Sequence, residues 1–482
     1  LNIKMILKSL GIVLVVEAIC MIPSLLVSAI YGDKDFMALV YSILTCFLFG
    51  FLMYRIKADN KNFYARDGFA FVALSWITVS LFGSLPFVFS GAIPSFIDAF
   101  FETSSGFTTT GSTILKQIEG MPMGVLFWRH FIIWMGGMGV LVLTLAVLPS
   151  VGASFFHVMK AESTGPSTEK LVPKLGQTAK ILYTIYIVMT AILVSALLFS
   201  GMSPYDALVH AFSTAGTGGF SSRNLSVGAY GNVFIEVIIT VFMFLFGVNF
   251  SLYFQLIKGN IRGFFKNQEF RFYLGTVLIA ILLITADLSL NGLFSVGESV
   301  RYSSFQVSSI ITTTGFSTRD FNLWPVFSKI ILVVLMFIGA SAGSTGGGMK
   351  CIRFVLMFKI VKREIMNIRH PRAVHTVKID GKSVDNGVLT NVMAFFFVYI
   401  IVFVSAVILV SLDGFDLVTT VTSVAAVISN VGPGLGDVGP MGNFSAFSGF
   451  SKILLSFCMI AGRLEIFPML VLFSPSSFKK SI

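Results

Sequence analysis

Thr312-Thr313-Thr314-Gly315-Phe316 is a short polar run between two long apolar segments, and three other places in the chain carry a similar run. In each, a glycine follows small residues, and hydroxyl side chains precede it in the first and third runs. The other three are Thr108-Thr109-Thr110-Gly111-Ser112, Thr217-Gly218-Gly219-Phe220 and Asn430-Val431-Gly432-Pro433. Such residues permit an extended backbone that turns its carbonyl groups toward one axis. The four runs therefore predict the four walls of one cation filter.

The second run contains two glycines, and two independent alignments select the second of them. Residues 219–224 (GFSSRN) match residues 315–320 (GFSTRD) at almost every position. An Asp-Ala pair begins 13 residues before Gly111, and another begins 13 residues before Gly219. The four glycines are then 108, 96 and 117 residues apart, which indicates a long internal repeat. The fourth copy departs most from the others.

Composition places the chain in a membrane. Of 482 residues, 55% are hydrophobic and 12% are charged, against roughly 25% charged in soluble domains. The net charge of +11 would suggest nucleic acid in a soluble protein, but here it follows from positively charged loops. Four cysteines without a C-x-x-C pair and five histidines without ligand spacing indicate no cofactor, metal centre or catalytic centre. We therefore expect an integral membrane protein that is not an enzyme and binds no nucleic acid.

Ten segments are long and apolar enough to cross a bilayer, which takes about 20 residues. They are 6–30, 36–56, 68–90, 124–149, 180–201, 231–257, 272–290, 326–361, 388–412 and 448–474, of which the eighth is interrupted. Four apolar segments are too short to cross and each ends at a filter glycine, which predicts re-entrant helices. These four are 94–106, 203–215, 298–311 and 415–428. Pro94-Ser95 and Ser203-Pro204 supply helix-start residues for the first two.

The order of these segments predicts an all-α integral membrane fold with ten transmembrane helices. An N-terminal transmembrane helix pair is followed by four units, each made of a helix, a pore loop and a second helix. Because every unit crosses twice, the four repeats are parallel and can surround a central pore. The predicted boundaries are 1–60 for the helix pair, then 68–150, 175–262, 270–372 and 386–482 for the pore repeats, the third with a Gly-rich intramembrane loop.

Lysine and arginine positions predict the orientation. With the N-terminus inside, most of the 34 basic residues fall in interior loops and termini. The positive-inside rule then places both termini in the cytoplasm and the filter loops on the outer face. Lys4 and Lys8 precede an apolar run without a small-residue cleavage site, which favours a first transmembrane helix over a signal peptide.

Backbone carbonyls can replace the hydration shell of an ion without the tight binding of a carboxylate. The C-terminal ends of the short helices point toward the same axis and add partial negative charge. None of the four runs contains Asp or Glu, whereas a calcium pore is expected to have a ring of them. We therefore expect selectivity for monovalent cations, with metal bound only at the filter residues.

The eighth apolar segment is interrupted by Gly339-Ala340-Ser341-Ala342-Gly343-Ser344-Thr345-Gly346-Gly347-Gly348. The break comes about 20 Å along the helix, where non-helical backbone must be buried in protein or line a wet cavity. We expect a movable gate beneath the filter; the alternative is a static, packed kink. Arg463 lies within the last predicted span, where a charge costs about 3 kcal/mol and suggests function. It can repel passing cations, or alternatively form an interhelical ion pair without a role in the pore.

The filter runs, the Gly-rich insert and Arg463 together resemble the Trk/Ktr/HKT superfamily of potassium transport proteins, and within it the TrkH-type membrane subunits. The resemblance covers essentially the whole chain. It implies a potassium-permeable pore, a homodimer, a cytosolic nucleotide-binding regulatory subunit (NAD or ATP) and a bacterial inner membrane location. In this superfamily a Ser at the first filter glycine goes with sodium permeation, whereas this chain keeps Gly111 and the other three glycines. Potassium is therefore the expected transported ion.

The leading hypothesis is a potassium-selective, channel-like uptake subunit, gated by the intramembrane loop and a pore arginine under control of the regulator. The alternative is a secondary transporter that couples potassium to sodium or protons; its class often uses inverted repeats and acidic midplane sites. Parallel repeats and a filter without carboxylates favour the channel, while the broken eighth span is compatible with the secondary transporter, which stays the alternative. The basic segment from Arg353 to Lys382 fits either an acidic protein partner or anionic membrane lipid.

Overall fold

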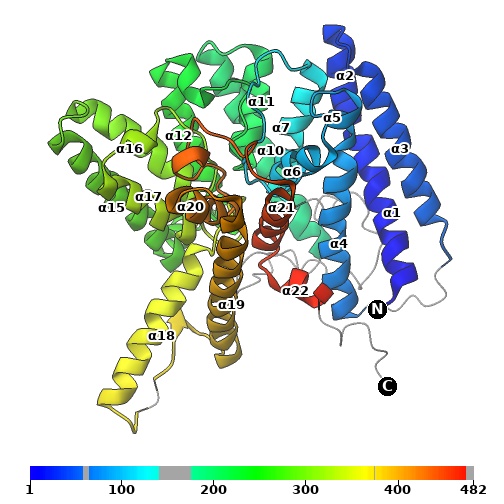
Figure 1. The fold of residues 1–482 in the computed structure, drawn as a ribbon. Coiled ribbons are helices and arrows are strands. Elements are labelled where there is room, and N and C mark those ends of the chain that lie inside the picture. Colours follow the sequence, from blue (N-terminus) through cyan, green and yellow to red (C-terminus); the bar gives the residue numbers. More distant parts are fainter. Residues whose placement is uncertain (58–63, 140–174, 374, 474–482) are drawn as a thin grey trace.

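The computed structural model describes residues 1–57, 64–139, 175–373 and 375–473 of the chain. In these ranges the protein is helical apart from one short antiparallel hairpin (Figure 1). The hairpin pairs β1 (Lys378–Ile379) with β2 (Lys382–Ser383). The expectation of an all-helical membrane fold is therefore confirmed at the level of a mostly helical, multi-span protein.

Three N-terminal helices lie at one side of the molecule (Figure 1). They are α1 (Ile3–Cys20), α2 (Ile22–Tyr31) and α3 (Phe36–Tyr54). Together α1 and α2 form one apolar stretch, Ile3–Tyr31, and α3 packs back against α1. Contact between α1 and α3 is close because Gly11 faces Gly50: a Cβ on Gly11 would lie 2.6 Å from the Gly50 carbonyl oxygen.

In each predicted repeat, the helix that precedes the polar run lies between other helices in the sequence. The first repeat has α4 (Ala65–Gly83), α5 (Leu85–Phe89), α6 (Phe96–Phe107) and α7 (Met123–Gly137). The second has α10 (Leu175–Phe199), α11 (Pro204–Ala215), α12 (Val233–Phe246), α13 (Phe250–Ile257) and α14 (Ile261–Lys266). The third has α15 (Gln268–Leu290), α16 (Val296–Ile311), α17 (Val326–Ile338) and α18 (Cys351–Arg369). The fourth has α19 (Asn386–Val410), α20 (Leu417–Ile428), α21 (Gly449–Arg463) and α22 (Phe467–Phe473).

The four short helices α6, α11, α16 and α20 begin at side-chain caps. The hydroxyls of Ser95, Ser203 and Ser295 accept hydrogen bonds from the backbone three residues on, and Asp416 does the same for α20. In α16, Glu298 completes a capping box with Ser295, whose hydrogen bonds hold the Glu298 pKa below its ordinary value. A cap satisfies the first free N–H groups and so fixes where a helix starts. The starts of these helices lie within two residues of their predicted positions.

Among the described residues, six helices are long and apolar enough to cross a membrane, or seven if α12 and α13 count as one bent span. Ten were predicted. The predicted eighth and tenth spans are each two shorter helices, and the predicted fourth span continues beyond residue 139, outside the described residues. Residues 140–150, the end of the predicted first pore repeat, also lie outside them.

Two spans predicted as continuous are broken in the structure. The segment 231–257 bends by 92° between α12 and α13, because Gly247 packs against Tyr273 and Thr312 and Asn249 caps the new helix. The segment 448–474 breaks after Arg463, where Glu465 and Ile466 adopt positive φ angles. A β-branched residue at positive φ is rare, so the surrounding contacts impose this turn.

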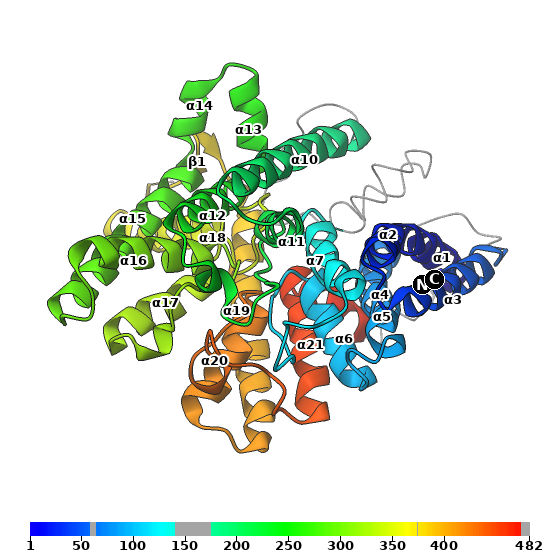
Figure 2. The same ribbon diagram turned by 90° about the horizontal axis from the view of Figure 1, so that it is seen from above.

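The repeats contact one another in a closed cycle, seen from above in Figure 2. Helix α7 of the first repeat contacts α11 of the second, and α12 of the second contacts α16 of the third. Helix α17 then contacts α20 of the fourth repeat, and α21 returns to α6 of the first. The four short helices are thereby held around one centre.

Candidate ion filter and gate

The four glycines of the polar runs lie in one ring. Each packs its α-carbon against the carbonyl of the residue that precedes the next glycine. The ring closes because Gly432 packs in the same way against the residue before Gly111. From a Cβ built on each glycine to that carbonyl oxygen, the distances are Gly111 to Gly218, 2.1 Å; Gly219 to Thr314, 2.0 Å; Gly315 to Val431, 2.2 Å; and Gly432 to Thr110, 2.7 Å. Real Cβ atoms do not come so close, so any side chain at these positions forces the ring apart.

All four runs share one backbone shape. The glycines have φ angles of +82°, +62°, +84° and +100°, in chain order. The residues two places earlier are also left-handed although they carry side chains: Thr109 (56°), Thr217 (54°), Thr313 (58°) and Asn430 (55°). Strained angles of this kind cluster at functional sites. The fourth run, whose sequence departs most, therefore has the same local conformation as the others, and Gly219 rather than Gly218 occupies the ring position in the second.

Threonine hydroxyl groups stabilise the first and third runs through hydrogen bonds. In the first, Thr108 Oγ1 donates to the Ser104 carbonyl and lies 2.8 Å from Thr110 Oγ1. The third run repeats this arrangement with Thr312 and Thr314 at the same separation. These four hydroxyls are therefore engaged with the helix ends and with one another, whereas Thr109 Oγ1 has no hydrogen-bond partner among the described residues.

Asn430 contributes hydrogen bonds that join the fourth run to the first. Its side-chain amide donates to Thr110 Oγ1 and to the Met459 carbonyl, both at 2.9 Å. In return, Ser112 Oγ donates to the Gly432 carbonyl at 3.0 Å. These bonds explain how an asparagine fits where the other runs have threonine.

The Gly-rich segment between α17 and α18 is non-helical and lies against the bend between α12 and α13. Ser341 N–H donates to the Gly247 carbonyl at 3.1 Å, and Phe250 N–H donates to the Gly343 carbonyl at 3.0 Å. Thr345 Oγ1 donates to the Phe246 carbonyl at 3.2 Å. The two broken helices therefore hold each other.

The same segment touches the filter runs directly. Gly347 N–H donates to Thr313 Oγ1 at 2.6 Å. A Cβ built on Gly346 would lie 2.9 Å from the Thr312 carbonyl oxygen, and one on Gly347 would lie 2.7 Å from that of Ser429. Glycines at 346 and 347 are therefore required for the segment to pack against Thr312 and Ser429.

Arg463, at the end of α21, connects this segment to the first repeat. Its guanidinium donates to the Thr345 carbonyl at 2.8 Å and to the carbonyls of Gly136 and Gly137, at the end of α7, at 2.7 and 2.8 Å. The side chain is buried. Glu465, two residues on, forms an ion pair with Arg353 at the start of α18.

Two further side chains, which the sequence pattern alone does not distinguish, hold the segment. Glu269, buried in the first turn of α15, accepts hydrogen bonds from Ala342 N–H at 2.6 Å and Ile352 N–H at 3.2 Å. Lys350 has a φ of 76° and donates to the Gly346 carbonyl. An acidic residue beside the apolar start of a span was the available signal for Glu269, but its partners are more than 70 residues away.

The other charged residues near the filter are engaged in ion pairs or hydrogen bonds. Arg223 pairs with Asp206 at 3.2 Å, and Arg319 donates to the Tyr302 hydroxyl at 3.0 Å. Glu17 in α1 is the exception, because its buried carboxyl oxygens have no hydrogen-bond partner among the described residues. These charges therefore shape the surroundings of the ring without entering the four runs.

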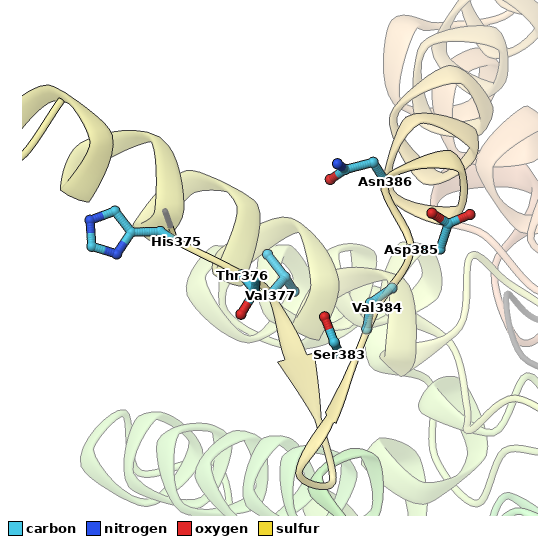
Figure 3. Close-up of a pocket in the computed structure, with 7 residues that line it drawn as sticks. All are labelled: His375, Thr376, Val377, Ser383, Val384, Asp385 and Asn386. Carbon is cyan, nitrogen blue, oxygen red and sulfur yellow. The ribbon is translucent and has the colours of Figure 1, made fainter. Parts of the chain in front are cut away.

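The described residues contain no group of three or more His, Cys, Asp or Glu side chains that could hold a metal ion. A pocket of about 380 Å³ lies at the β1–β2 hairpin (Figure 3). Its lining consists of His375, Thr376, Val377, Ser383, Val384, Asp385 and Asn386. None of these residues belongs to the filter runs or to the Gly-rich segment.

The geometry defines a class of protein: a helical, multi-span membrane protein in which four short helices deliver four glycine-containing turns to one ring. A family model described as TrkH, cation transport protein, matches residues 36–482. The chain therefore belongs to the TrkH family of cation transport proteins, which are not enzymes.

Individual relatives match over their whole length. The Trk system potassium uptake protein TrkH of Halomonas elongata is 37% identical over 484 residues, covering 100% of both chains. The protein of the same description from Escherichia coli (strain K12) is 35% identical over 485 residues, again covering both completely. The crystal structure of the potassium transporter TrkH from Vibrio parahaemolyticus aligns with a TM-score of 0.88 at 33% identity, covering 99% of this chain and 100% of that one.

Proposed function

We propose that this protein is a potassium-selective, channel-like uptake subunit whose four parallel repeats surround one central pore. The observation that carries the proposal is the closed ring of glycine-to-carbonyl contacts from Gly111 through Gly219 and Gly315 to Gly432. Potassium as the ion is supported by the descriptions of the relatives as potassium uptake proteins. The filter comprises residues 109–112, 217–220, 313–316 and 430–433.

Conduction follows from the chemistry of the ring. A cation that enters from the outer side loses water, and backbone carbonyls of the four runs replace it. The C-terminal ends of α6, α11, α16 and α20 add partial negative charge at the same place. With no carboxylate in the runs, binding stays weak enough for the ion to leave again.

The Gly-rich segment, residues 339–348, acts in this proposal as the gate. It contacts Thr313 of the filter, and also Thr312 and Ser429, which directly precede the third and fourth filter runs. Arg463 fastens it to the end of α7. Opening requires the segment to leave these contacts, and a cytosolic regulatory subunit would control that step.

Helix α18 is the element on which the regulatory subunit is expected to act. This helix follows the gate segment directly and projects beyond the helical bundle (Figure 1). It carries basic residues and, on one face, the exposed apolar side chains of Phe358, Val361, Ile365 and Ile368. We infer a homodimer, a nucleotide-binding regulator on the cytosolic side and contact with membrane lipid. The location is a bacterial inner membrane with both termini in the cytoplasm.

A secondary transporter that couples potassium to sodium or protons is the second candidate. The breaks between α12 and α13 and between α17 and α18 favour it, because carriers often bind ions at broken helices. Parallel repeats and a ring without carboxylates favour the channel.

Reconstitution separates these functions. The purified protein in liposomes is expected to take up potassium and rubidium well and sodium poorly under equal gradients. Single-channel current recording in a planar bilayer is expected to give discrete conductance steps, which a strictly alternating carrier cannot produce. Equal uptake of sodium and potassium contradicts the selectivity, and uptake that strictly requires a sodium or proton gradient supports the carrier.

A further inference from the structure

A polar side chain occupies the same register in all four short helices, nine residues before the ring glycine. The four residues are Glu102, His210, Gln306 and Ser423. Each is buried in the structure. A buried polar side chain needs a hydrogen-bond partner, and in three of the four repeats that partner lies beyond the ring glycine.

Three of these side chains reach past the glycine to hold the backbone or side chains that follow it. Glu102 accepts from Thr113 Oγ1 at 2.8 Å and from Ile114 N–H at 2.9 Å. His210 Nε2 lies 2.9 Å from Ser221 Oγ, and Gln306 Nε2 donates to the Phe316 carbonyl at 3.5 Å. These contacts fix the outer end of each run to its own helix.

In the fourth repeat, the residue next to Ser423 makes the hydrogen bond to the segment beyond the glycine. Ser423 Oγ donates to the Thr420 carbonyl within the helix at 2.9 Å. Thr422 Oγ1 instead accepts from Leu435 N–H, also at 2.9 Å. Leu435 follows its glycine by three residues, as Ile114 does in the first repeat.

The first repeat differs because its residue is a carboxylate with an arginine partner. Arg129 Nε, from α7, lies 2.8 Å from Glu102 Oε1, and the two side chains are 1% and 0% exposed. The guanidinium also donates to the Ser221 carbonyl at 3.3 Å and stands 3.5 Å from the centre of the Phe220 ring. Through Phe220 and Ser221, the pair touches the second wall as well as the first.

We propose that Glu102 and Arg129 form a positioning pair that sets the ion selectivity of the filter by fixing the first wall to the second. A ring of carbonyls discriminates against a smaller cation when it cannot contract around that cation. Loss of either partner leaves the other charge buried and uncompensated, so the local structure must relax. Relaxation around the pair changes the spacing between the first and second filter runs. Permeation of sodium then increases relative to that of potassium. This inference rests on the proposed potassium filter.

The test measures selectivity rather than rate alone. The full-length protein and its variants Glu102→Gln and Arg129→Gln are reconstituted into liposomes, and uptake of radioactive sodium and rubidium is compared under matched gradients. We expect the sodium-to-rubidium ratio to rise about tenfold in both variants. Thr113→Ala, which removes one hydrogen bond to Glu102 and keeps the ion pair, is expected to raise the ratio about twofold to threefold.

The matched control is a second ion pair within the helical bundle. Glu236 of α12 and Arg301 of α16 are joined by two contacts, at 2.6 and 2.7 Å, and lie outside the four filter runs. Glu236→Gln is expected to leave the sodium-to-rubidium ratio within about twofold of the parent. Size-exclusion profiles and thermal melting are recorded for each variant, so that only folded protein is compared.

The possible outcomes distinguish a failure of the Glu102–Arg129 pair from a failure of the proposed filter. An unchanged ratio in the folded variants, Thr113→Ala included, overturns the role of the pair while leaving the filter in place. An equal rise in Glu236→Gln also overturns it, because any buried ion pair would then have the same effect. A parent protein that takes up no rubidium above empty liposomes overturns the proposed function, and the inference with it.

Discussion

Replacing Arg463 by glutamine is expected to open the proposed gate. Among the described residues, the guanidinium donates hydrogen bonds to the carbonyl oxygen of Thr345 on the Gly-rich segment and to those of Gly136 and Gly137 on α7. Movement of the segment away from the filter breaks the bond to Thr345 and leaves the two to α7. The bond to Thr345 is therefore the part of this contact that favours the closed state.

The size of the effect follows from that single bond. A hydrogen bond to a charged group contributes about 1.5–3 kcal/mol. At about 2 kcal/mol, its loss changes the ratio of closed to open protein about thirtyfold. If the segment is closed most of the time, the rate of cation uptake rises by the same factor until opening is no longer limiting. Removal of the positive charge also weakens repulsion of the passing cation, which acts in the same direction.

Rubidium uptake into liposomes measures this change, with Arg463→Lys and Arg301→Gln beside Arg463→Gln. Lysine keeps the charge but cannot reach three carbonyls with one planar group, so intermediate uptake is expected. Arg301 pairs with Glu236 and, among the described residues, makes no hydrogen bond to the Gly-rich segment, so its variant should transport as the parent does. Parental uptake rates in Arg463→Gln would refute a gating role for this arginine.

Three other substitutions probe the same parts of the molecule. Deletion of Ala342 to Gly347 removes the gate segment and should raise basal rubidium uptake; unchanged uptake would show that the segment is a static kink. Glu269→Gln replaces the charge-assisted bonds to the segment with neutral ones of about half the strength, so uptake should rise about fivefold, and a fall would contradict a latch at this position. Gly219→Ala places a Cβ 2.0 Å from the Thr314 carbonyl oxygen at a φ of +62°, so uptake should be lost. Transport by folded Gly219→Ala protein at the parental rate would argue against the ring.

The short helices were predictable from sequence because their limits are set locally. Segment 94–106 corresponds to α6 (Phe96–Phe107), and segment 415–428 corresponds to α20 (Leu417–Ile428). A serine or aspartate cap fixes each start, and the polar run fixes each end. The common register of the four glycines was also visible, since small residues and hydroxyls stand out between apolar segments.

The breaks in α12–α13 and α21–α22 were not predictable in the same way. Residues 231–257 are almost continuously apolar, and Gly247 alone does not distinguish a bend from a buried helix. The bend is imposed by contacts from Tyr273 and from Ser341 of the Gly-rich segment, both remote in sequence. Likewise, Arg129 meets Glu102 and Glu269 meets Ala342 only after the repeats have assembled, so the sequence could not pair them.

In the proposed function, alkali cations are held by backbone carbonyls of the four runs, on the axis of the glycine ring. An experimental structure of the protein in rubidium salt, with anomalous scattering recorded at the rubidium edge, tests this most directly. Rubidium peaks are predicted on the axis enclosed by residues 109–112, 217–220, 313–316 and 430–433. Rubidium bound reproducibly elsewhere in the membrane region, with none among these four runs, would contradict the claim.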